Sequence, residues 1–216
     1  MKNKILAFFK SNYSWIICFF LMLLFIFTAH SVLNKDILKI DTTIYQFLHQ
    51  FSSTSVTNFF KVVTHLAGGY ILIGICIIVF LAIKKKKFFY IISLNLINTI
   101  LCNQGLKLLF TRERPFELAL INESGYSFPS GHSMAAMSFY GFLIYITFHS
   151  NLNSKYKWVI TIILSLLILL IGISRIYLGV HYASDVIAGF SISVSYLIIF
   201  TKIIKNYLWE VKCDEQ

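Results

Sequence analysis

The segment SRIYLGVHYASD, residues 174–185, places ionisable side chains directly before an apolar run of membrane-spanning length. Its His181 and Asp185 are four residues apart, so on a helix that opens this run they lie on one face and can form a hydrogen bond. A carboxylate that accepts a hydrogen bond from one ring nitrogen fixes the tautomer and the orientation of the histidine ring, and it leaves the other nitrogen basic. Alternatively, Asp185 only caps or charges the helix start. The spacing marks a candidate catalytic pair and leaves both interpretations open.

A second polar segment, PSGH at residues 129–132, precedes another apolar run. Ser130 fits the N-cap position of a helix, and Gly131 allows a ligand to approach the backbone next to His132. The free N–H groups at a helix start, together with the helix dipole, favour an anion such as phosphate or carboxylate. The alternative is a capped helix that binds nothing.

Three cations, Lys107, Arg114 and Arg175, lie at predicted helix ends. Singly, such residues are usually solvated or contact phospholipid headgroups. Phosphoryl transfer spreads negative charge over three equatorial oxygens, and its catalysis consists largely of positioning and of donors aimed at that charge. Three cations beside two histidines therefore indicate phosphate chemistry. Arg112 and Glu113, between Lys107 and Arg114, are interpreted as loop or headgroup-contacting residues because nothing in the sequence distinguishes them.

The elements that must position these residues are apolar runs of membrane-spanning length. The chain has 216 residues, 57% of them hydrophobic and 13% charged, which is outside the usual range for soluble domains. A helix needs about 20 apolar residues to cross the hydrocarbon layer. Six segments meet this requirement: Tyr13–Leu33, Val62–Ile83, Phe88–Phe110, His132–Phe148, Trp158–Tyr177 and Val186–Ile204. The sequence predicts a single-domain, all-α membrane protein with six transmembrane helices over residues 1–216.

The distribution of charge predicts the orientation of the chain. If the six spans alternate from a cytoplasmic N-terminus, the inner side carries 12 Lys and Arg against 3 Asp and Glu, and the outer side 7 against 6. The positive-inside rule therefore predicts cytoplasmic N- and C-termini and an extracytoplasmic site. The net charge of +10 is a topological signal on this interpretation, and we expect no nucleic-acid partner.

The first outer connection contains a further candidate element, DTTIYQFLHQF at residues 41–51. After a capping Asp41, its apolar residues recur at near-helical spacing, which is typical of an amphipathic helix lying on the bilayer surface. Ordinary loop packing is the alternative. The four cysteines show no metal-ligand spacing, so we expect neither a disulfide nor a cysteine metal site.

Taken together, the polar segments resemble the type 2 phosphatidic acid phosphatase superfamily of integral-membrane lipid phosphate phosphatases. Lys107, Arg114 and Pro115 match KxxxxxxRP, residues 129–132 match PSGH, and residues 174–185 match SRxxxxxHxxxD. All three motifs are complete, and their order and placement fit over nearly the whole chain. The resemblance implies an acid phosphatase/vanadium haloperoxidase-like helical bundle and a metal-independent phosphatase whose site faces the extracytoplasmic side.

The resemblance also implies a role for each matching residue. His181 is similar to the nucleophile that becomes phosphohistidine, Asp185 to its orienting partner, and His132 to the general acid that later activates water. The phosphate-binding residues implied are Lys107, Arg114, Ser130, the Gly131 backbone N–H and Arg175. The implied substrate is a lipid phosphate in the bilayer, such as undecaprenyl diphosphate, phosphatidylglycerol phosphate or phosphatidic acid. No cofactor is implied, and too few acids lie near the site for two magnesium ions.

Other classes of protein fit the same residues less well. A hydrolase triad of Ser130, His132 and Asp185 leaves the cations unexplained and lacks the GxSxG pattern. A metal site formed by His132, His181 and Asp185 would place a divalent ion among three cations. The alternative outside enzymology is a non-catalytic lipid-phosphate-binding protein or a transporter, although transporters usually bind substrate near the bilayer midplane.

Overall fold

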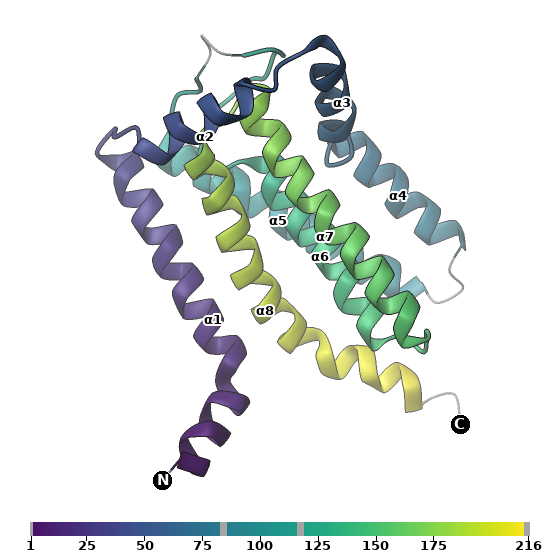
Figure 1. Ribbon diagram of the computed structural model, residues 1–216. Helices are drawn as coiled ribbons and strands as arrows, with labels where there is room; N and C mark the ends of the chain where they lie inside the picture. Colours follow the sequence, from purple (N-terminus) through teal and green to yellow (C-terminus); the bar gives the residue numbers. More distant parts are fainter. Residues whose placement is uncertain (1, 83–85, 116–118, 214–216) are drawn as a thin grey trace.

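A computed structural model describes the backbone of residues 2–82, 86–115 and 119–213, and the side chains of residues 12–81, 86–115 and 119–207. Within these ranges the chain forms helices and connecting loops, with no strand. The helices are α1 (Lys2–Leu33), α2 (Lys39–His49), α3 (Thr54–His65), α4 (Gly69–Ala82), α5 (Lys86–Phe110), α6 (Gly131–His149), α7 (Ser154–Tyr177) and α8 (Ala183–Cys213). Figure 1 shows the long helices side by side, with the short α2 lying across one end of the bundle.

Five of the six predicted spans lie within single helices, namely α1, α5, α6, α7 and α8. Among the described residues, three helical segments are long and apolar enough to cross a membrane by length and composition: Asn12–Leu33, Ser154–Tyr177 and Ala183–Tyr207. Helices α5 and α6, which bury polar residues such as Asn95, Asn103 and Ser138, are not among these three. Six spans and cytoplasmic termini therefore stay predictions.

The predicted span Val62–Ile83 differs from the structure, which has two helices here instead of one. Helix α3 begins earlier, at Thr54, and meets α4 at a bend of 49°. The N–H of Gly68 donates to the carbonyl of His65 over 2.8 Å, and a Cβ at position 68 would lie 2.9 Å from that oxygen. Consecutive glycines at 68 and 69 therefore favour a helix end at this point. Ile83 lies outside the described residues.

Helix α2 confirms that the amphipathic segment of the first connection is helical. Its Ile44, Tyr45 and Leu48 pack against the buried cluster of Ile176, Ala183 and Val186 from α7 and α8. Other apolar side chains of this segment, Phe47 and Phe51, are exposed. The helix therefore uses one part of its apolar surface for packing within the protein and leaves another part uncovered.

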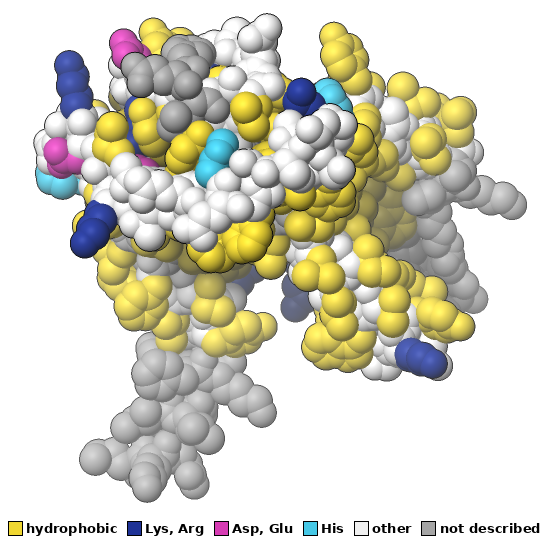
Figure 2. Space-filling model, turned by 45° about the horizontal axis from the view of Figure 1, so that its top comes forward, with side chains coloured by type: hydrophobic (Ala, Val, Ile, Leu, Met, Phe, Trp, Pro, Cys, Tyr) yellow, Lys and Arg dark blue, Asp and Glu magenta, His cyan; other side chains and the backbone are white. Residues whose placement is uncertain are grey.

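Helix α6 lies at the centre of the bundle, in contact with α5, α7 and α8. Its Phe139 and Phe142 belong to the main buried cluster together with Leu72 of α4 and Ile171 of α7. Large apolar residues on the outer surfaces of the other long helices, such as Phe27 of α1, are exposed instead. In Figure 2 the visible acidic and histidine side chains gather at the end carrying α2, and apolar side chains cover most of the flanks. Such flanks suit contact with lipid tails.

Candidate active site

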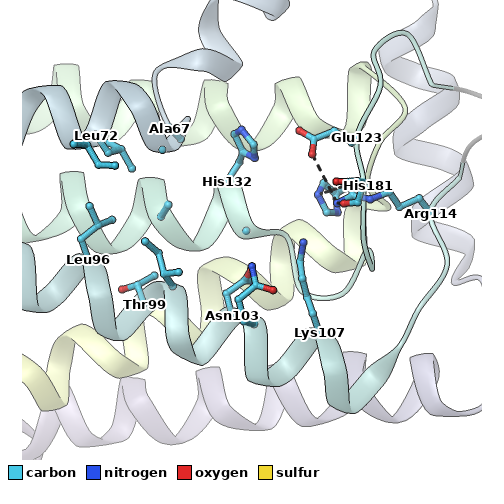
Figure 3. A pocket seen from close by; sticks show the side chains of 17 residues that line it. Ala67, Leu72, Leu96, Thr99, Asn103, Lys107, Arg114, Glu123, His132 and His181 are labelled. Carbon is cyan, nitrogen blue, oxygen red and sulfur yellow. Dashed lines mark hydrogen bonds and ion pairs between the residues drawn. The ribbon is translucent and has the colours of Figure 1, made fainter.

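The structure brings the predicted site residues together at one end of the bundle. They come from the end of α5, the start of α6, the end of α7, the start of α8 and the loops between these helices. Five of them line one cavity of about 310 Å³: Lys107, Arg114, Gly131, His132 and His181 (Figure 3). The other three, Ser130, Arg175 and Asp185, lie behind this lining and are 0% exposed. Each of them forms hydrogen bonds with neighbouring side chains. Segments far apart in the sequence thus form one site.

His181 and Asp185 contact each other as predicted, but His181 lies in the turn before α8 and not on the same helix as Asp185. Helix α8 begins only at Ala183, and the N–H of Tyr182 donates to Asp185 Oδ2 over 2.9 Å. His181 Nδ1 lies 3.3 Å from the same oxygen. Asp185 therefore satisfies a free N–H at the helix start and also holds the histidine, so both interpretations of this residue from the sequence apply.

Both carboxylate oxygens of Asp185 have donors. The Ser127 hydroxyl donates to Oδ2, and Arg112 Nη1 donates to Oδ1 over 2.5 Å. The side chain of Asp185 is 0% exposed, so these donors replace the water that an ionised carboxylate would otherwise bind. The carboxylate is consequently held in one orientation.

The second ring nitrogen of His181 points to the cation cluster. Its Nε2 lies 3.1 Å from Arg114 Nη1. Because Nδ1 donates to Asp185, Nε2 carries the lone pair and accepts from the guanidinium. Burial lowers the pKa of His181 to about 4, since the raising effect of Asp185 is smaller and Arg175 and Arg114 lower it further. His181 is therefore neutral at neutral pH, which is the form that has a nucleophilic nitrogen.

Arg114 is held by backbone carbonyl groups of the loops around it. Its Nε donates to Gly125, its Nη1 to Val180 and its Nη2 to Ser124, over 2.8, 2.9 and 3.0 Å. These carbonyl groups, and not a carboxylate, fix the orientation of the guanidinium. The Glu123 carboxylate is farther away, with 3.9 Å between Arg114 Nη2 and Glu123 Oε2. The guanidinium charge therefore remains available to an anion in the cavity.

Arg175 projects from the last turn of α7 and is fully buried. Its Nη1 donates to Thr64 Oγ1 of α3 over 2.6 Å, and its Nη2 donates to Glu123 over 2.5 Å. Within the part of the chain that the structure describes, its Nε has no hydrogen-bond partner. The Nε–H of Arg175 is therefore a donor that remains for another acceptor.

Glu123, which no sequence motif indicated, lines the cavity between Arg175 and Arg114. Burial would raise the pKa of this carboxyl, but Arg175 and then Arg114 hold the pKa below its ordinary value. Glu123 is therefore ionised and lies where it contacts the same guanidinium groups that an anion would bind. Its position in an irregular loop gave no periodic signal in the sequence.

The start of α6 is capped as predicted. Ser130 Oγ accepts from the N–H and the hydroxyl of Ser133, over 3.4 and 3.0 Å. Gly131 has a packing reason to lack a side chain, because a Cβ there would lie 2.9 Å from Asn103 Oδ1. Asn103 in turn donates to the carbonyl of Pro129 over 3.1 Å, which ties α5 to the PSGH segment.

Arg112 corrects an interpretation from the sequence. We interpreted Arg112 and Glu113 as loop or headgroup-contacting residues, and Glu113 is indeed exposed. The side chain of Arg112, however, is only 9% exposed and binds Asp185 together with Asp41 of α2. The interpretation was wrong for Arg112 because its partners lie 71 and 73 residues away, beyond the range of any local pattern.

The alternative classes of site can now be compared with this geometry. Asp185 bonds to His181, and Ser130 caps a helix, so the hydrolase triad of Ser130, His132 and Asp185 is not formed. Among the described residues, no three His, Cys, Asp or Glu side chains are arranged to hold a metal ion. The described cysteines, Cys18, Cys76 and Cys102, are free thiols.

The fold and the site together define an α-helical membrane protein with a cavity lined by cations and histidines at one end of its bundle. The family model described as the PAP2 superfamily matches residues 86–209, and the chain belongs to this superfamily. This match confirms the family resemblance found in the sequence. The matched range includes all eight predicted site residues, from Lys107 to Asp185.

Two curated relatives and two solved structures are similar to this chain. Phosphatidylglycerophosphatase B of Bacillus subtilis is 38% identical over 140 residues, covering 61% of this chain and 67% of the relative. Lipid A 4'-phosphatase of Porphyromonas gingivalis is 26% identical over 189 residues, covering 80% and 75%.

The first of the two structures is the transmembrane PAP2 type phosphatidylglycerolphosphate phosphatase from Bacillus subtilis. It matches with a TM-score of 0.79 and 28% identity, covering 88% of this chain and 96% of that chain. The second is LpxE of Aquifex aeolicus, with a TM-score of 0.62 and 26% identity, covering 76% and 96%. The protein is therefore a multi-pass membrane protein with the PAP2 membrane phosphatase fold.

Proposed function

We propose that this protein is a membrane lipid phosphatase that hydrolyses the phosphomonoester or diphosphate headgroup of a lipid through a phosphohistidine intermediate. The observation that carries the proposal is the position of His181, whose Nε2 lies beside Arg114 on the wall of a cavity that also holds Lys107 and His132. A neutral imidazole nitrogen among fixed cations is suited to attack a phosphorus atom whose oxygens those cations bind.

In the first step Arg114 Nη1 exchanges its hydrogen bond to His181 Nε2 for one to a phosphoryl oxygen. The freed Nε2 lone pair forms a bond to phosphorus as the bond to the leaving oxygen breaks. Asp185 accepts the Nδ1 hydrogen bond and stabilises the positive charge that develops on the ring. The transferred phosphoryl oxygens take donors from Lys107, Arg114, Arg175, Ser130 and the Gly131 N–H. The leaving oxygen receives a proton from His132.

In the second step His132, now neutral, removes a proton from a water molecule that attacks the phosphohistidine. The phosphorus–nitrogen bond breaks, inorganic phosphate leaves, and His181 returns to its neutral form. All acid–base and nucleophilic roles are filled by residues of this chain, so we propose that the reaction requires no metal ion.

A lipid substrate is supported by the shape and lining of the cavity. One end carries Lys107, Arg114 and His181, and the lining continues to the apolar side chains Leu72 and Leu96 of α4 and α5 (Figure 3). A molecule that fills this cavity has an anionic head and an apolar portion. The relatives named for phosphatidylglycerophosphate and lipid A make phosphatidylglycerol phosphate the first substrate to test. We also propose, from the charge distribution, that this end faces the extracytoplasmic side.

The test is phosphate release by purified protein from phosphatidylglycerol phosphate, phosphatidic acid and undecaprenyl diphosphate, with EDTA present throughout. We expect turnover of at least one lipid, unchanged by EDTA. The background is the His181→Ala variant, and His65→Ala, which removes an exposed histidine at the end of α3, is the matched control. Binding of these lipids without any phosphate release would support the non-catalytic alternative. Activity that EDTA abolishes and a divalent ion restores would contradict metal independence.

A further inference from the structure

Arg112 lies at the centre of a buried chain of alternating charges that ends at His181. Its Nη1 donates to Asp185 Oδ1 over 2.5 Å, and its Nη2 donates to Asp41 Oδ2 over 3.3 Å. The side chains of Asp41, Arg112 and Asp185 are only 1%, 9% and 0% exposed. Buried ions require oppositely charged partners in good geometry. Arg112 pairs with both carboxylates, and each carboxylate pairs with Arg112.

Asp41 joins this chain of charges to the start of α8. Its Oδ1 accepts from the Ser184 N–H over 2.7 Å, and its Oδ2 accepts from the Ser184 hydroxyl over 2.9 Å. The same hydroxyl oxygen accepts from Arg112 Nη1 over 2.8 Å. The guanidinium also lies 4.0 Å from the centre of the Tyr182 ring, a cation–π geometry. Tyr182 and Ser184, which precede Asp185, and Asp41 of α2 therefore surround Arg112.

We infer that Arg112 is a positioning residue for the reaction, with Asp41 as its anchor on α2; this inference rests on the proposed function, in which His181 is the nucleophile. Arg112 holds Oδ1 so that Oδ2 remains directed at His181 Nδ1. It also offsets part of the carboxylate charge, so that Asp185 orients the imidazole without drawing a proton onto it. Asp41 in turn offsets part of the charge on Arg112.

This arrangement predicts opposite electrostatic effects for the two residues. Loss of the cation at position 112 exposes His181 to more of the Asp185 charge, which raises the pKa of His181. Loss of the anion at position 41 leaves more positive charge near the ring, which keeps that pKa at or below its starting value. The other charged or titratable groups that act on His181 are unchanged in both cases, namely Arg114, Glu123, His132 and Arg175.

The experiment compares Arg112→Gln, Arg112→Lys and Asp41→Asn in the full-length protein. The controls are Lys39→Gln and Asp36→Asn, which remove one exposed charge of the same sign at the start of α2 or just before it. We expect Arg112→Gln to lower kcat about 10- to 100-fold with little change in KM, the usual scale for a residue that orients a reacting group. Arg112→Lys should recover part of the loss, and both controls should match the wild-type protein.

The pH profile is the readout that a merely structural role would not move. In Arg112→Gln the acid limb of kcat/KM should lie at higher pH than in the wild-type protein, whereas in Asp41→Asn it should not. Wild-type kcat in Arg112→Gln, or acid limbs that coincide in both variants and the wild-type protein, would overturn the inference. If Arg112→Gln does not fold, Arg112→Lys and Asp41→Asn still decide it, because an upward shift in Asp41→Asn also contradicts it.

A second measurement separates this inference from the proposed function. Histidine-selective NMR in micelles, assigned with His181→Ala, follows the protonation of His181 without turnover. If the wild-type protein hydrolyses no lipid phosphate, the proposed function fails. The pKa of His181 should nevertheless rise in Arg112→Gln and not in Asp41→Asn, and the same pKa in all three proteins would overturn the role of Arg112.

Discussion

The two histidines of the site are held in contrasting ways. His181 has both ring nitrogens within hydrogen-bond distance of fixed partners, Asp185 on one side and Arg114 on the other. His132 lines the same cavity from the first turn of α6, but no hydrogen bond links its ring to any described residue. A nucleophile benefits from a fixed orientation, whereas a group that serves first the leaving oxygen and then water must reach two positions. The difference in restraint matches the difference in proposed role.

The largest effect is expected from removing the restrained histidine. His181→Ala should lower kcat by about 10⁶-fold, the scale seen when the nucleophile of a covalent mechanism is lost. Phosphate release and trapping of labelled phosphoenzyme after acid-free quenching measure the two consequences. The thermal unfolding midpoint in detergent checks that the variant folds. Turnover at the wild-type rate would remove the nucleophile assignment.

Removing the less restrained histidine should cost less. His132→Ala should lower kcat by about 10²- to 10⁴-fold on lipid phosphates, the range for general acid–base catalysis. The loss in kcat/KM, which reports the first step, should shrink with a p-nitrophenyl ester, whose leaving oxygen needs no proton. Labelled phosphoenzyme should accumulate with either substrate because water is no longer activated. Equal losses for both leaving groups would argue against the acid role.

The pH dependence tests the restraint on His181 itself. Because burial lowers its pKa to about 4, kcat/KM should not decline through this group until the pH falls toward that value. The unfolded chain, with an ordinary histidine pKa, binds a proton that the folded chain does not between about pH 6.5 and 4. The free energy of unfolding should therefore decrease as the pH falls, by about 3 kcal/mol.

Rates and unfolding midpoints between pH 4 and 8 measure both parts of this prediction. In His181→Asn, the share of the stability change that comes from this ring should disappear. An acid limb of kcat/KM near pH 6.5 that remains when His132 is replaced would show that the ring of His181 is not shielded as described.

The smallest effect should come from the backbone next to His132. Gly131→Ala places a Cβ 2.9 Å from Asn103 Oδ1, so Asn103 or the start of α6 must shift. A displacement of this kind should lower kcat about tenfold and unfolding stability by about 1 kcal/mol. Gly105→Ala is the matched control, since a Cβ at position 105 meets nothing within 4 Å. Equal behaviour of the two variants would mean that the approach of α5 and α6 is not tight enough to matter.

The sequence could predict the parts of the structure that depend on local pattern. Membrane-length hydropathy located the long helices, the spacing of His181 and Asp185 indicated their contact, and Ser130 was placed as an N-cap. The break after His65 was missed because the apolar run continues through Gly68 and Gly69 in hydropathy alone. The roles of Arg112 and Glu123 and the contact of Asp41 with Ser184 could not be predicted, since they depend on partners 50 or more residues away.

The contact between Asp41 and Ser184 spans 143 positions of the chain. During synthesis the ribosome must therefore add 143 residues after Asp41 before the carboxylate on α2 can meet the beginning of α8. His181 and Asp185 also leave the ribosomal tunnel after α1 to α7. A nascent chain that has already inserted its earlier helices consequently carries Lys107 and Arg114 but not His181, so the proposed site is completed only when the start of α8 has been made.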